Sequence, residues 1–380
     1  MQRGRKLIII SLISCLFLTG CLETHILEEL GIVTIYGFDQ AEGEDKLKST
    51  TVLFQFNPDV TDASQIIHST GSTFRELRNN ANKKSGYKIV SGQLRTILFG
   101  PKLSRAGIFP HIDTLQRDAS ISDMVFIAVS NQPTEQVLTA SNYEQSPNIG
   151  TYIQRLIETS VRDERITSST LHEFSKKFFT VGYDPLVPII ANHDNKAQLT
   201  GLAIFQDDHY VDELSIEDVF YVRLISDKFK QGQVDLKLPI EPFKNMMEDF
   251  EEPNSDQVIV VLDQLNNKTN VEITNPGGYD FKVDVDIQGR IVELTERIDL
   301  QNKEAIKKLE EHMSEEIKTN IERIIEKSKE VNSDFFGFGK EYVSRNGNNQ
   351  MTKEEWRDIY PNINVTVNVT TKIRSYGIVE

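Results

Sequence analysis

Cysteine is scarce in this 380-residue chain, which contains two cysteines and a single tryptophan. Both cysteines, Cys15 and Cys21, lie near the N-terminus, and none follows them. The body of the protein therefore contains neither a disulfide bond nor a free thiol, even if it lies outside the cytoplasm.

Long hydrophobic runs are also missing. The longest, Leu7 to Leu18, is shorter than the roughly 20 residues that cross a bilayer, and no later segment is apolar enough to span a membrane. Arg3, Arg5 and Lys6 precede this run, and small residues follow it. This order indicates a secretory signal peptide over residues 1–20.

The expected cleavage site has the sequence Leu18-Thr19-Gly20-Cys21, which resembles a bacterial lipobox. The motif implies cleavage before Cys21 and diacylation of its thiol, whereas a plain secretory signal is the alternative. Two acyl chains are enough for stable anchoring. We therefore expect Cys21 to be a lipidation site and the mature chain to be tethered to a membrane surface.

Basic residues are fewer than acidic ones, 42 Lys and Arg against 57 Asp and Glu, and the net charge is −15. The charged residues of the expected signal peptide are all basic, so its removal makes the mature chain more acidic still. Such a surface repels nucleic acid and anionic lipid headgroups. Nucleic-acid binding is therefore excluded, and membrane attachment is expected to depend on the lipid.

Catalytic motifs are absent too: there is no Walker loop, no Gly-x-Ser-x-Gly elbow and no His-Glu-x-x-His. His111 and Asp113 could share a metal, but nothing nearby supplies further ligands. Asp284 and Asp286 alternate with apolar residues, which favours a solvated sheet face over a calcium loop. We therefore expect no catalytic residue, no cofactor, no metal site and no enzymatic activity.

The N-terminal half alternates strand and helix signals. Short β-branched and aromatic runs predict strands at residues 31–39, 51–56, 93–100 and 124–130. Helical spacing predicts one helix with Phe74, Leu77 and Ala81 on its apolar face and Ser72 as its cap, and a second over residues 147–163. Residues 207–209 read as the polar turn of a hairpin.

The C-terminal half predicts a long helix on an antiparallel sheet. Residues 280–294 alternate apolar and polar side chains and turn near Gly289, residues 362–374 alternate in the same way, and residues 258–262 suit a central strand. Between them, residues 302–331 form a helix with an apolar stripe. Its predicted members are Ile306, Leu309, Met313, Ile317, Ile321 and Ile324.

The expected fold class is therefore α+β and multi-domain, with mixed and antiparallel sheets. After the signal peptide, about two or three domains fit the length. The polar stretch Ala191 to Gly201 is the best boundary. We expect an N-terminal region over residues 21–195, open to division into two subdomains, and a C-terminal α+β domain over residues 200–380.

The stretch Ser333 to Tyr342, "SDFFGFGKEY", superficially matches a kinase Asp-Phe-Gly and a glycine-rich phosphate loop. A phosphate loop follows a strand and opens a helix, whereas this stretch follows the long helix. We interpret it as architecture: the helix ends near Asn332, the glycines let the chain turn, and Phe335, Phe336 and Phe338 fill the edge of the core.

This stretch also carries a family resemblance. "DFFGFGKEY", the tryptophan segment at residues 353–378 and the charged helix before them resemble the C-terminal domain of the Ger(x)C family. Upstream, residues 29–39, 71–121 and 201–205 are similar to other family segments, in the family's order. One departure is Gln93, where many members have histidine, which counts against a catalytic or metal-binding role there.

The resemblance implies a setting. Ger(x)C proteins are lipoprotein C subunits of nutrient germinant receptors in spore-forming bacteria. It implies a membrane-anchored protein on the outer face of the spore inner membrane, partnered with integral-membrane A and B subunits and required for germination. The alternatives are an extracytoplasmic solute-binding lipoprotein, which would have two similar parallel lobes, and a surface hydrolase, for which a catalytic constellation is missing.

Overall fold

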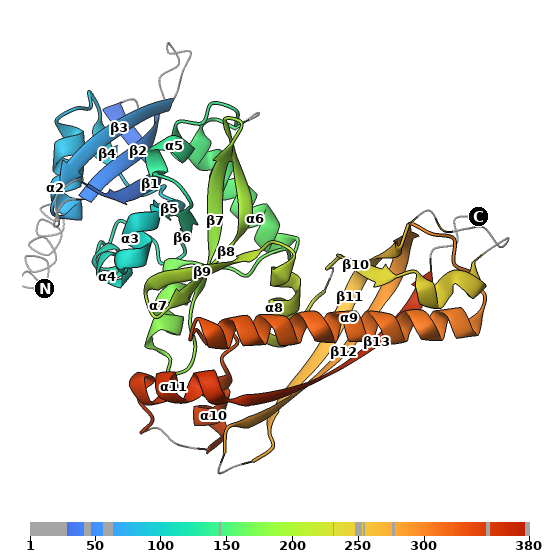
Figure 1. The fold of residues 1–380 in the computed structure, drawn as a ribbon. Coiled ribbons are helices and arrows are strands. Elements are labelled where there is room, and N and C mark those ends of the chain that lie inside the picture. Colours follow the sequence, from blue (N-terminus) through green and yellow to red (C-terminus); the bar gives the residue numbers. More distant parts are fainter. Residues whose placement is uncertain are drawn as a thin grey trace, which may run out of the picture.

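We describe the protein in a computed structural model. The description covers residues 29–41, 47–55, 64–143, 146–230, 232–247, 253, 255–275, 278–346 and 350–376. The expected signal peptide and Cys21 lie outside these residues. Figure 1 shows two sheets, with the long helix α9 (Lys303–Glu330) lying along the second.

The first sheet, within the described residues, has nine strands in the order β3-β2-β1-β5-β6-β7-β8-β9, with β4 paired to β1. The neighbours β1, β5, β6 and β7 are parallel, and the flanking strands are antiparallel. The four predicted strands are confirmed as β1, β2, β5 and β6. The strands are β1 (Leu30–Gln40), β2 (Leu47–Gln55), β3 (Ser64–Gly71), β4 (Lys88–Val90), β5 (Thr96–Phe99), β6 (Phe126–Ser130), β7 (Leu186–His193), β8 (Lys196–Gln206) and β9 (His209–Ser215).

Helices cover both faces of this sheet because apolar side chains alternate to both sides of its central strands. α5 and α6 pack on one face, and α2, α3, α4 and α7 pack on the other. Their bounds are α2 (Phe74–Asn82), α3 (Pro101–Ala106), α4 (Phe109–Gln116), α5 (Thr134–Leu138), α6 (Ile149–Arg162) and α7 (Leu171–Phe179).

Both helices predicted in this half are confirmed as α2 and α6, with one correction. The N-cap of α2 is Thr73 rather than Ser72, because the Thr73 hydroxyl accepts the Glu76 backbone N–H at 3.1 Å. The Ser72 N–H instead donates to the Glu76 carboxylate at 2.8 Å. The cap of α6 is Asn148, which accepts from the backbone N–H of Thr151.

Two hairpins end the first sheet. Asp194 and Asn195, both with positive φ, turn the chain from β7 into β8. The predicted polar turn at residues 207–209 is confirmed between β8 and β9. The sheet therefore crosses the stretch proposed as a domain boundary, and the division at residues 195–200 stays a prediction.

The second sheet, counted over the described residues, has four strands in the order β10-β11-β12-β13. The first two pairs are antiparallel and the last is parallel, so the mostly antiparallel sheet is confirmed. The turn expected near Gly289 is wrong: β12 continues through it, and its pairings with both β11 and β13 shift register there. The strands are β10 (Val234–Pro239), β11 (Gln257–Ile273), β12 (Asp280–Leu294) and β13 (Asn364–Tyr376).

The apolar stripe of α9 faces this sheet and the short helix α8 (Asp218–Ser226). Of its six predicted members, all but the half-buried Ile306 are buried. The chain then forms α10 (Phe338–Asn346), α11 (Lys353–Ile359) and a 3-10 turn (Tyr360–Asn362) before β13. Another 3-10 turn, Glu241–Met246, packs against α9.

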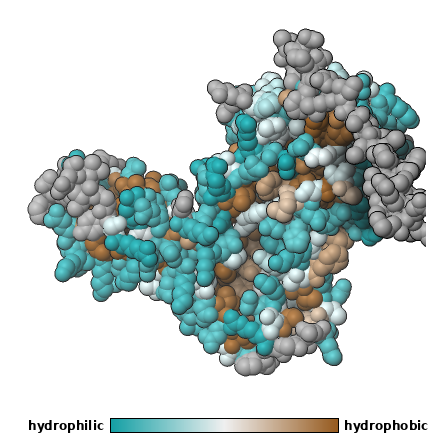
Figure 2. All heavy atoms as spheres, turned by 180° about the vertical axis from the view of Figure 1, so that it is seen from behind, coloured by the Kyte–Doolittle hydropathy of each residue, from teal (hydrophilic) through white to brown (hydrophobic). Residues whose placement is uncertain are grey.

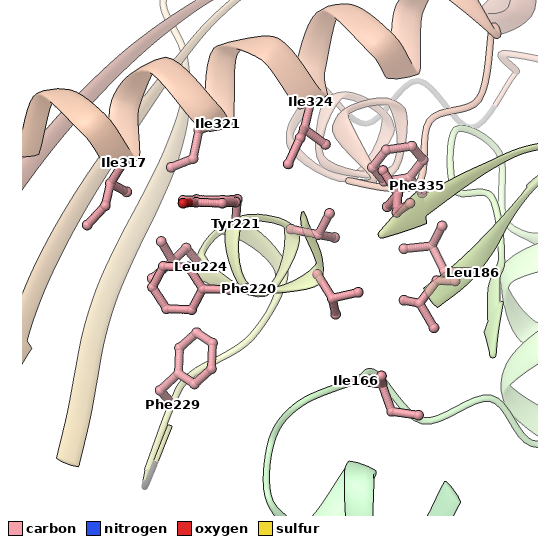
Figure 3. Close-up of a cluster of buried hydrophobic side chains, with 14 of the residues drawn as sticks. Ile166, Leu186, Phe220, Tyr221, Leu224, Phe229, Ile317, Ile321, Ile324 and Phe335 are labelled. Atoms are coloured by element: carbon pink, nitrogen blue, oxygen red, sulfur yellow. The ribbon is translucent and has the colours of Figure 1, made fainter. Parts of the chain in front are cut away.

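One hydrophobic cluster runs from the first sheet to the second. Figure 3 shows its middle, where α8 lies between α9 and the end of the first sheet. Leu186 comes from β7, Phe220 and Leu224 from α8, and Ile321 from α9. These side chains share one core. The part of the protein built on the first sheet and the part built on the second sheet are therefore packed together rather than linked loosely.

The surface seen from behind is mostly hydrophilic, with hydrophobic residues in separate patches (Figure 2). Within the described ranges, no helix combines the length and apolarity that crossing a bilayer requires. The long helix α9 is amphipathic and carries many charges on the side away from the core.

Candidate functional site

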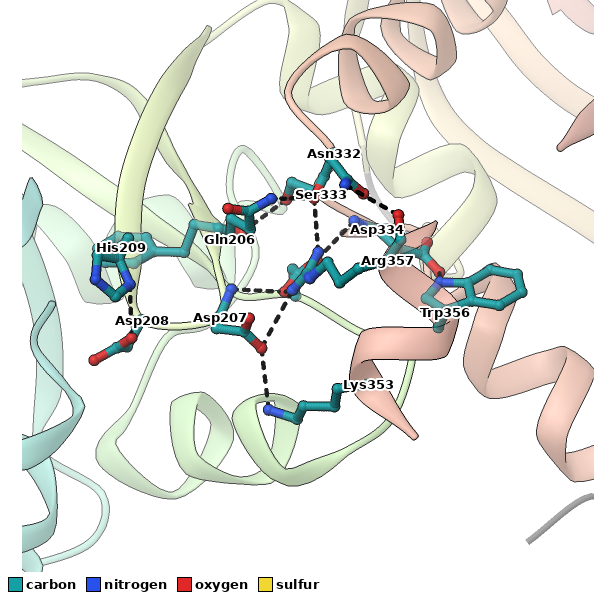
Figure 4. A network of polar contacts seen from close by, with 12 residues as sticks. Gln206, Asp207, Asp208, His209, Asn332, Ser333, Asp334, Lys353, Trp356 and Arg357 are labelled. Carbon is teal, nitrogen blue, oxygen red and sulfur yellow. Dashed lines mark hydrogen bonds and ion pairs between the residues drawn. The ribbon is translucent and has the colours of Figure 1, made fainter. Parts of the chain in front are cut away.

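Buried polar groups gather where the two parts meet. Figure 4 shows them: the β8–β9 turn approaches the segment after α9 and the helix α11. A loop just before β7 completes the set. We call this cluster the polar joint and define it as Asp184, Asp207, Asp334, Trp356 and Arg357.

Asp184 and Arg357 form the central pair of the joint. Arg357 donates to both carboxylate oxygens of Asp184, from Nη1 at 2.6 Å and from Nη2 at 2.5 Å. The same carboxylate accepts the backbone N–H of Asp207 at 2.9 Å and of Asp334 at 2.7 Å. The Asp184 side chain is only 4% exposed, so this fork-to-fork geometry holds a charge pair away from water.

Arg357 also lies 3.2 Å from Asp207. Burial acts to lower the pKa of Arg357, but the hydrogen bonds and charges of the two carboxylates raise it, so the guanidinium stays charged. Burial likewise acts to raise the pKa of Asp207, but the charges of Arg357 and Lys353 hold it below its ordinary value.

Asp334 is fully buried at the start of the phenylalanine-rich turn. Among the described groups, its carboxylate accepts the backbone N–H groups of Gly337, Phe338 and Gly339 and the indole N–H of Trp356, at 2.8 to 3.0 Å. Burial raises the pKa of Asp334 to about 7, and the N–H donors limit this rise. One side chain thus fixes the turn and docks α11 onto it.

Hydrogen bonds from side chains to backbone carbonyl groups hold the end of α9 against the first sheet and α11. Asn332 adopts positive φ, and its carbonyl accepts from Arg357 at 2.7 Å and from Gln206 at 3.1 Å. The Ser333 hydroxyl donates to the carbonyl of Phe205 in β8 at 2.7 Å. The termination of the long helix is therefore specified by residues of both parts.

Two glycines allow the close approach. A Cβ placed on Gly339 would lie 2.6 Å from the Cα of Gly182 and would also strike Trp356. Gly182 has φ of +65°, and its carbonyl accepts the Lys340 N–H at 3.1 Å. Because backbone meets backbone here, larger side chains would push the two parts away from each other.

The polar groups of the joint stabilise the structure. Each carboxylate oxygen of Asp184 and Asp334 already accepts two hydrogen bonds from protein groups. The adjoining cavity measures about 10 Å³, which is too small for a substrate and barely holds one water molecule. We conclude that the joint holds the two parts in a fixed relation.

The residues weighed as metal ligands have other partners. His111 meets the Phe74 ring edge-on, and Asp113 pairs with Arg117 one turn along α4. Asp284 binds Lys282 and Asn368 on the solvated sheet face. Among the described residues, no three His, Cys, Asp or Glu side chains converge as a metal site would require. Cys21 lies outside the described residues.

The interpretation of Ser333 to Tyr342 as architecture is confirmed, since Phe335, Phe336 and Phe338 are buried. The polar joint itself was not predicted. A signal existed in the aspartate that opens the "DFFGFG" turn and in the arginine beside the single tryptophan. The sequence alone could not pair either of them with Asp184.

The fold and the joint define a two-part α+β protein whose polar cluster fastens the parts together. A family profile described as "Spore germination protein N-terminal domain" matches residues 23–192. A second, described as "Spore germination B3/GerAC like, C-terminal", matches residues 200–377. The chain therefore belongs to the Ger(x)C family of spore germination proteins.

Individual proteins agree over nearly the whole length. The chain is 26% identical over 373 residues to the spore germination protein GerQC of Bacillus cereus, covering 98% of this chain and 99% of that one. It is 19% identical over 392 residues to the putative spore germination protein YfkR of Bacillus subtilis, covering 97% and 96%. The crystal structure of the GerBC protein is similar with a TM-score of 0.52 at 15% identity, covering 89% of this chain and 96% of that chain, which confirms the fold.

Proposed function

We propose that this chain is the lipid-anchored C subunit of a nutrient germinant receptor. In this proposal it acts by assembling with integral-membrane A and B subunits on the outer face of the spore inner membrane. The observation that carries the proposal is the match of both family profiles, in order, across residues 23–192 and 200–377. In this role the chain contributes binding energy to the assembly rather than catalysis.

The anchor would hold the body close to the membrane. β1 begins at Leu30, nine residues after Cys21. Nine extended residues span at most about 30 Å. A diacylated Cys21 would therefore keep the start of β1 within about 30 Å of the headgroups.

The polar joint supports a role in assembly. A subunit that contacts two partners transmits position between them only if its own parts keep a fixed relation. The shared hydrophobic core and the buried Asp184–Arg357 pair supply this rigidity. The joint also explains why a chain without an evident catalytic group would need buried charges.

The two alternatives are less well supported. A solute-binding lipoprotein has two similar parallel lobes, whereas these two sheets differ in size, and the second is mostly antiparallel. A hydrolase needs a nucleophile and a base near a substrate cavity. The buried carboxylates of the joint instead face groups that already occupy them.

Co-purification tests the proposal. The chain, carrying a C-terminal tag, is purified from detergent-solubilised spore membranes and the proteins that travel with it are identified by mass spectrometry. We expect two integral-membrane proteins in amounts comparable to the chain. Recovery of the chain alone, or with an ATP-driven transporter, would contradict the receptor assignment.

A further inference from the structure

A cavity of about 400 Å³, separate from the polar joint, is lined by residues of β1 and β2 and by residues of α2 and the end of α4. Figure 1 shows where these elements lie at the first sheet. The volume of the cavity falls within the roughly 300–1,000 Å³ of small-molecule sites. The proposed assembly role makes no use of it.

Four buried hydroxyl groups line one side of this cavity, which we call its hydroxyl floor: those of Tyr36, Ser49, Thr51 and Ser91. Tyr36 and Phe38 of β1 lie opposite Thr51 and Ser49 of β2 in the sheet register, so all four share one face. The Tyr36 hydroxyl meets Ser91 at 3.0 Å, and the Ser49 and Thr51 hydroxyls lie 3.2 Å apart. A hydroxyl can donate one hydrogen bond and accept two, so these pairs retain capacity for a ligand.

Aromatic rings provide the apolar wall. The rings of Tyr36 and Phe38 stack at 5.4 Å, and Phe74 of α2 meets Phe38 edge-on at 4.5 Å. Leu77 and Ala81 of α2 continue the wall. Such a surface fits a planar or branched apolar group.

The charge of the lining contrasts with that of the protein. Among the described residues around the cavity there are three arginines, Arg75, Arg78 and Arg117, and a single carboxylate, Asp118. Arg78 bonds to Asp118 at 3.1 Å and Arg117 pairs with Asp113 outside the cavity. With Arg78 and Arg117 each paired with one carboxylate, Arg75 gives the lining a net positive charge, which favours an anionic group in a chain of net charge −15.

We propose that this cavity binds a small organic anion, with an aromatic or branched apolar body against Phe38 and Phe74 and a carboxylate on Arg78. Binding exchanges the Arg78–Asp118 pair for a pair between Arg78 and the ligand. The remaining polar atoms of the ligand meet the hydroxyl floor. This inference goes beyond the assembly role and does not depend on it.

Three probes with the same phenylpropyl body separate charge from shape: 3-phenylpropionate, 3-phenylpropan-1-ol and 3-phenylpropylamine. The full chain in detergent is titrated with each probe by ligand-observed NMR. We expect the anion to bind at least tenfold more tightly than the alcohol and the amine to bind most weakly. Equal binding of all three probes, or no binding of any at millimolar concentration, overturns the proposal.

Two variants break the same ion pair in opposite ways. Arg78→Gln removes the guanidinium and should weaken the anion at least tenfold while leaving the alcohol unchanged. Asp118→Asn frees Arg78 and should leave anion binding unchanged or tighter. An equal loss in both variants would show that the pair is only structural and would overturn the proposal.

A third variant locates the site. Ala81→Phe fills the cavity from α2, and a folded variant should lose binding of all three probes. Retention of binding in this variant would place the probes elsewhere and contradict the proposal. If Ala81→Phe does not fold, the Arg78 and Asp118 pair of variants still decides the outcome.

Discussion

Asp184 and Arg357 form a buried bidentate ion pair across 173 positions of sequence. One comes from the loop before β7 and the other from α11. Around this pair the backbone of Asp207, the turn at Asp334 and the end of α9 all find hydrogen-bond partners. The relation of the two sheets is therefore fixed by a few side chains as well as by the shared core.

The first prediction concerns this pair. Arg357→Ala leaves the Asp184 carboxylate buried and uncompensated, so we expect it to lower the free energy of unfolding by about 3–5 kcal/mol. Because the joint couples the two parts, urea unfolding should also separate into two transitions. Arg345→Ala is the matched control, since Arg345 and Glu341 form an exposed pair at 3.4 Å worth at most about 1 kcal/mol. Equal losses in the two variants would contradict the role of the joint.

The second prediction concerns the pH dependence that Asp334 contributes. Its pKa is raised to about 7 in the folded protein from an ordinary value of 3.8. Between these values the folded chain binds more protons than the unfolded chain, so this residue lowers the free energy of unfolding as pH rises from about 4 to about 7. Above about pH 7 its contribution becomes constant.

Asp334→Asn should remove this slope, although the amide nitrogen cannot accept the N–H groups that the carboxylate accepts, so the variant is less stable throughout. The measurement is urea unfolding of both proteins from about pH 5 to about pH 8. The stability advantage of the wild type should shrink up to about pH 7 and then stay level. A constant difference across this range would show that Asp334 is ionised throughout.

The third prediction concerns the glycine contact. Gly339→Ala forces a methyl group against Gly182 and the Trp356 ring, and we expect a loss of about 1–3 kcal/mol in the free energy of unfolding. Trp356 fluorescence should change as well, because it is the single tryptophan. Gly92→Ala is the control, since a Cβ at Gly92 meets no described atom within 4 Å. Comparable losses in both variants would refute the close-contact account.

The fourth prediction concerns the anchor. Cys21→Ala removes the thiol that the lipobox motif would diacylate, so the chain should leave the membrane fraction or remain unprocessed. Cys15→Ala, within the expected signal peptide, is the control and should leave attachment unchanged. Fractionation and intact mass report the outcome. A membrane-bound and fully matured Cys21→Ala protein would exclude the lipid anchor.

Local patterns allowed much of the fold to be predicted. Alternation identified β12 and β13, and a stripe at steps of three and four identified α9, because each element buries one face against a neighbour. The same reasoning failed at Gly289, since a glycine in a strand can mark a shift of register as readily as a turn.

The polar joint could not be predicted because its contacts are non-local. Asp184, Asp207 and Asp334 each stand in an ordinary loop sequence. Only the packing of α9 and α11 on the first sheet brings Asp184 and Asp207 to Arg357, and the backbone of Asp334 to Asp184.

The most direct test of the proposed receptor role is nutrient germination in spores that retain only the receptor to which this chain belongs. Deleting its gene from that strain should abolish the loss of optical density that nutrients cause. The spores should stay viable and still germinate with a non-nutrient trigger. Unchanged nutrient germination after the deletion would contradict the account.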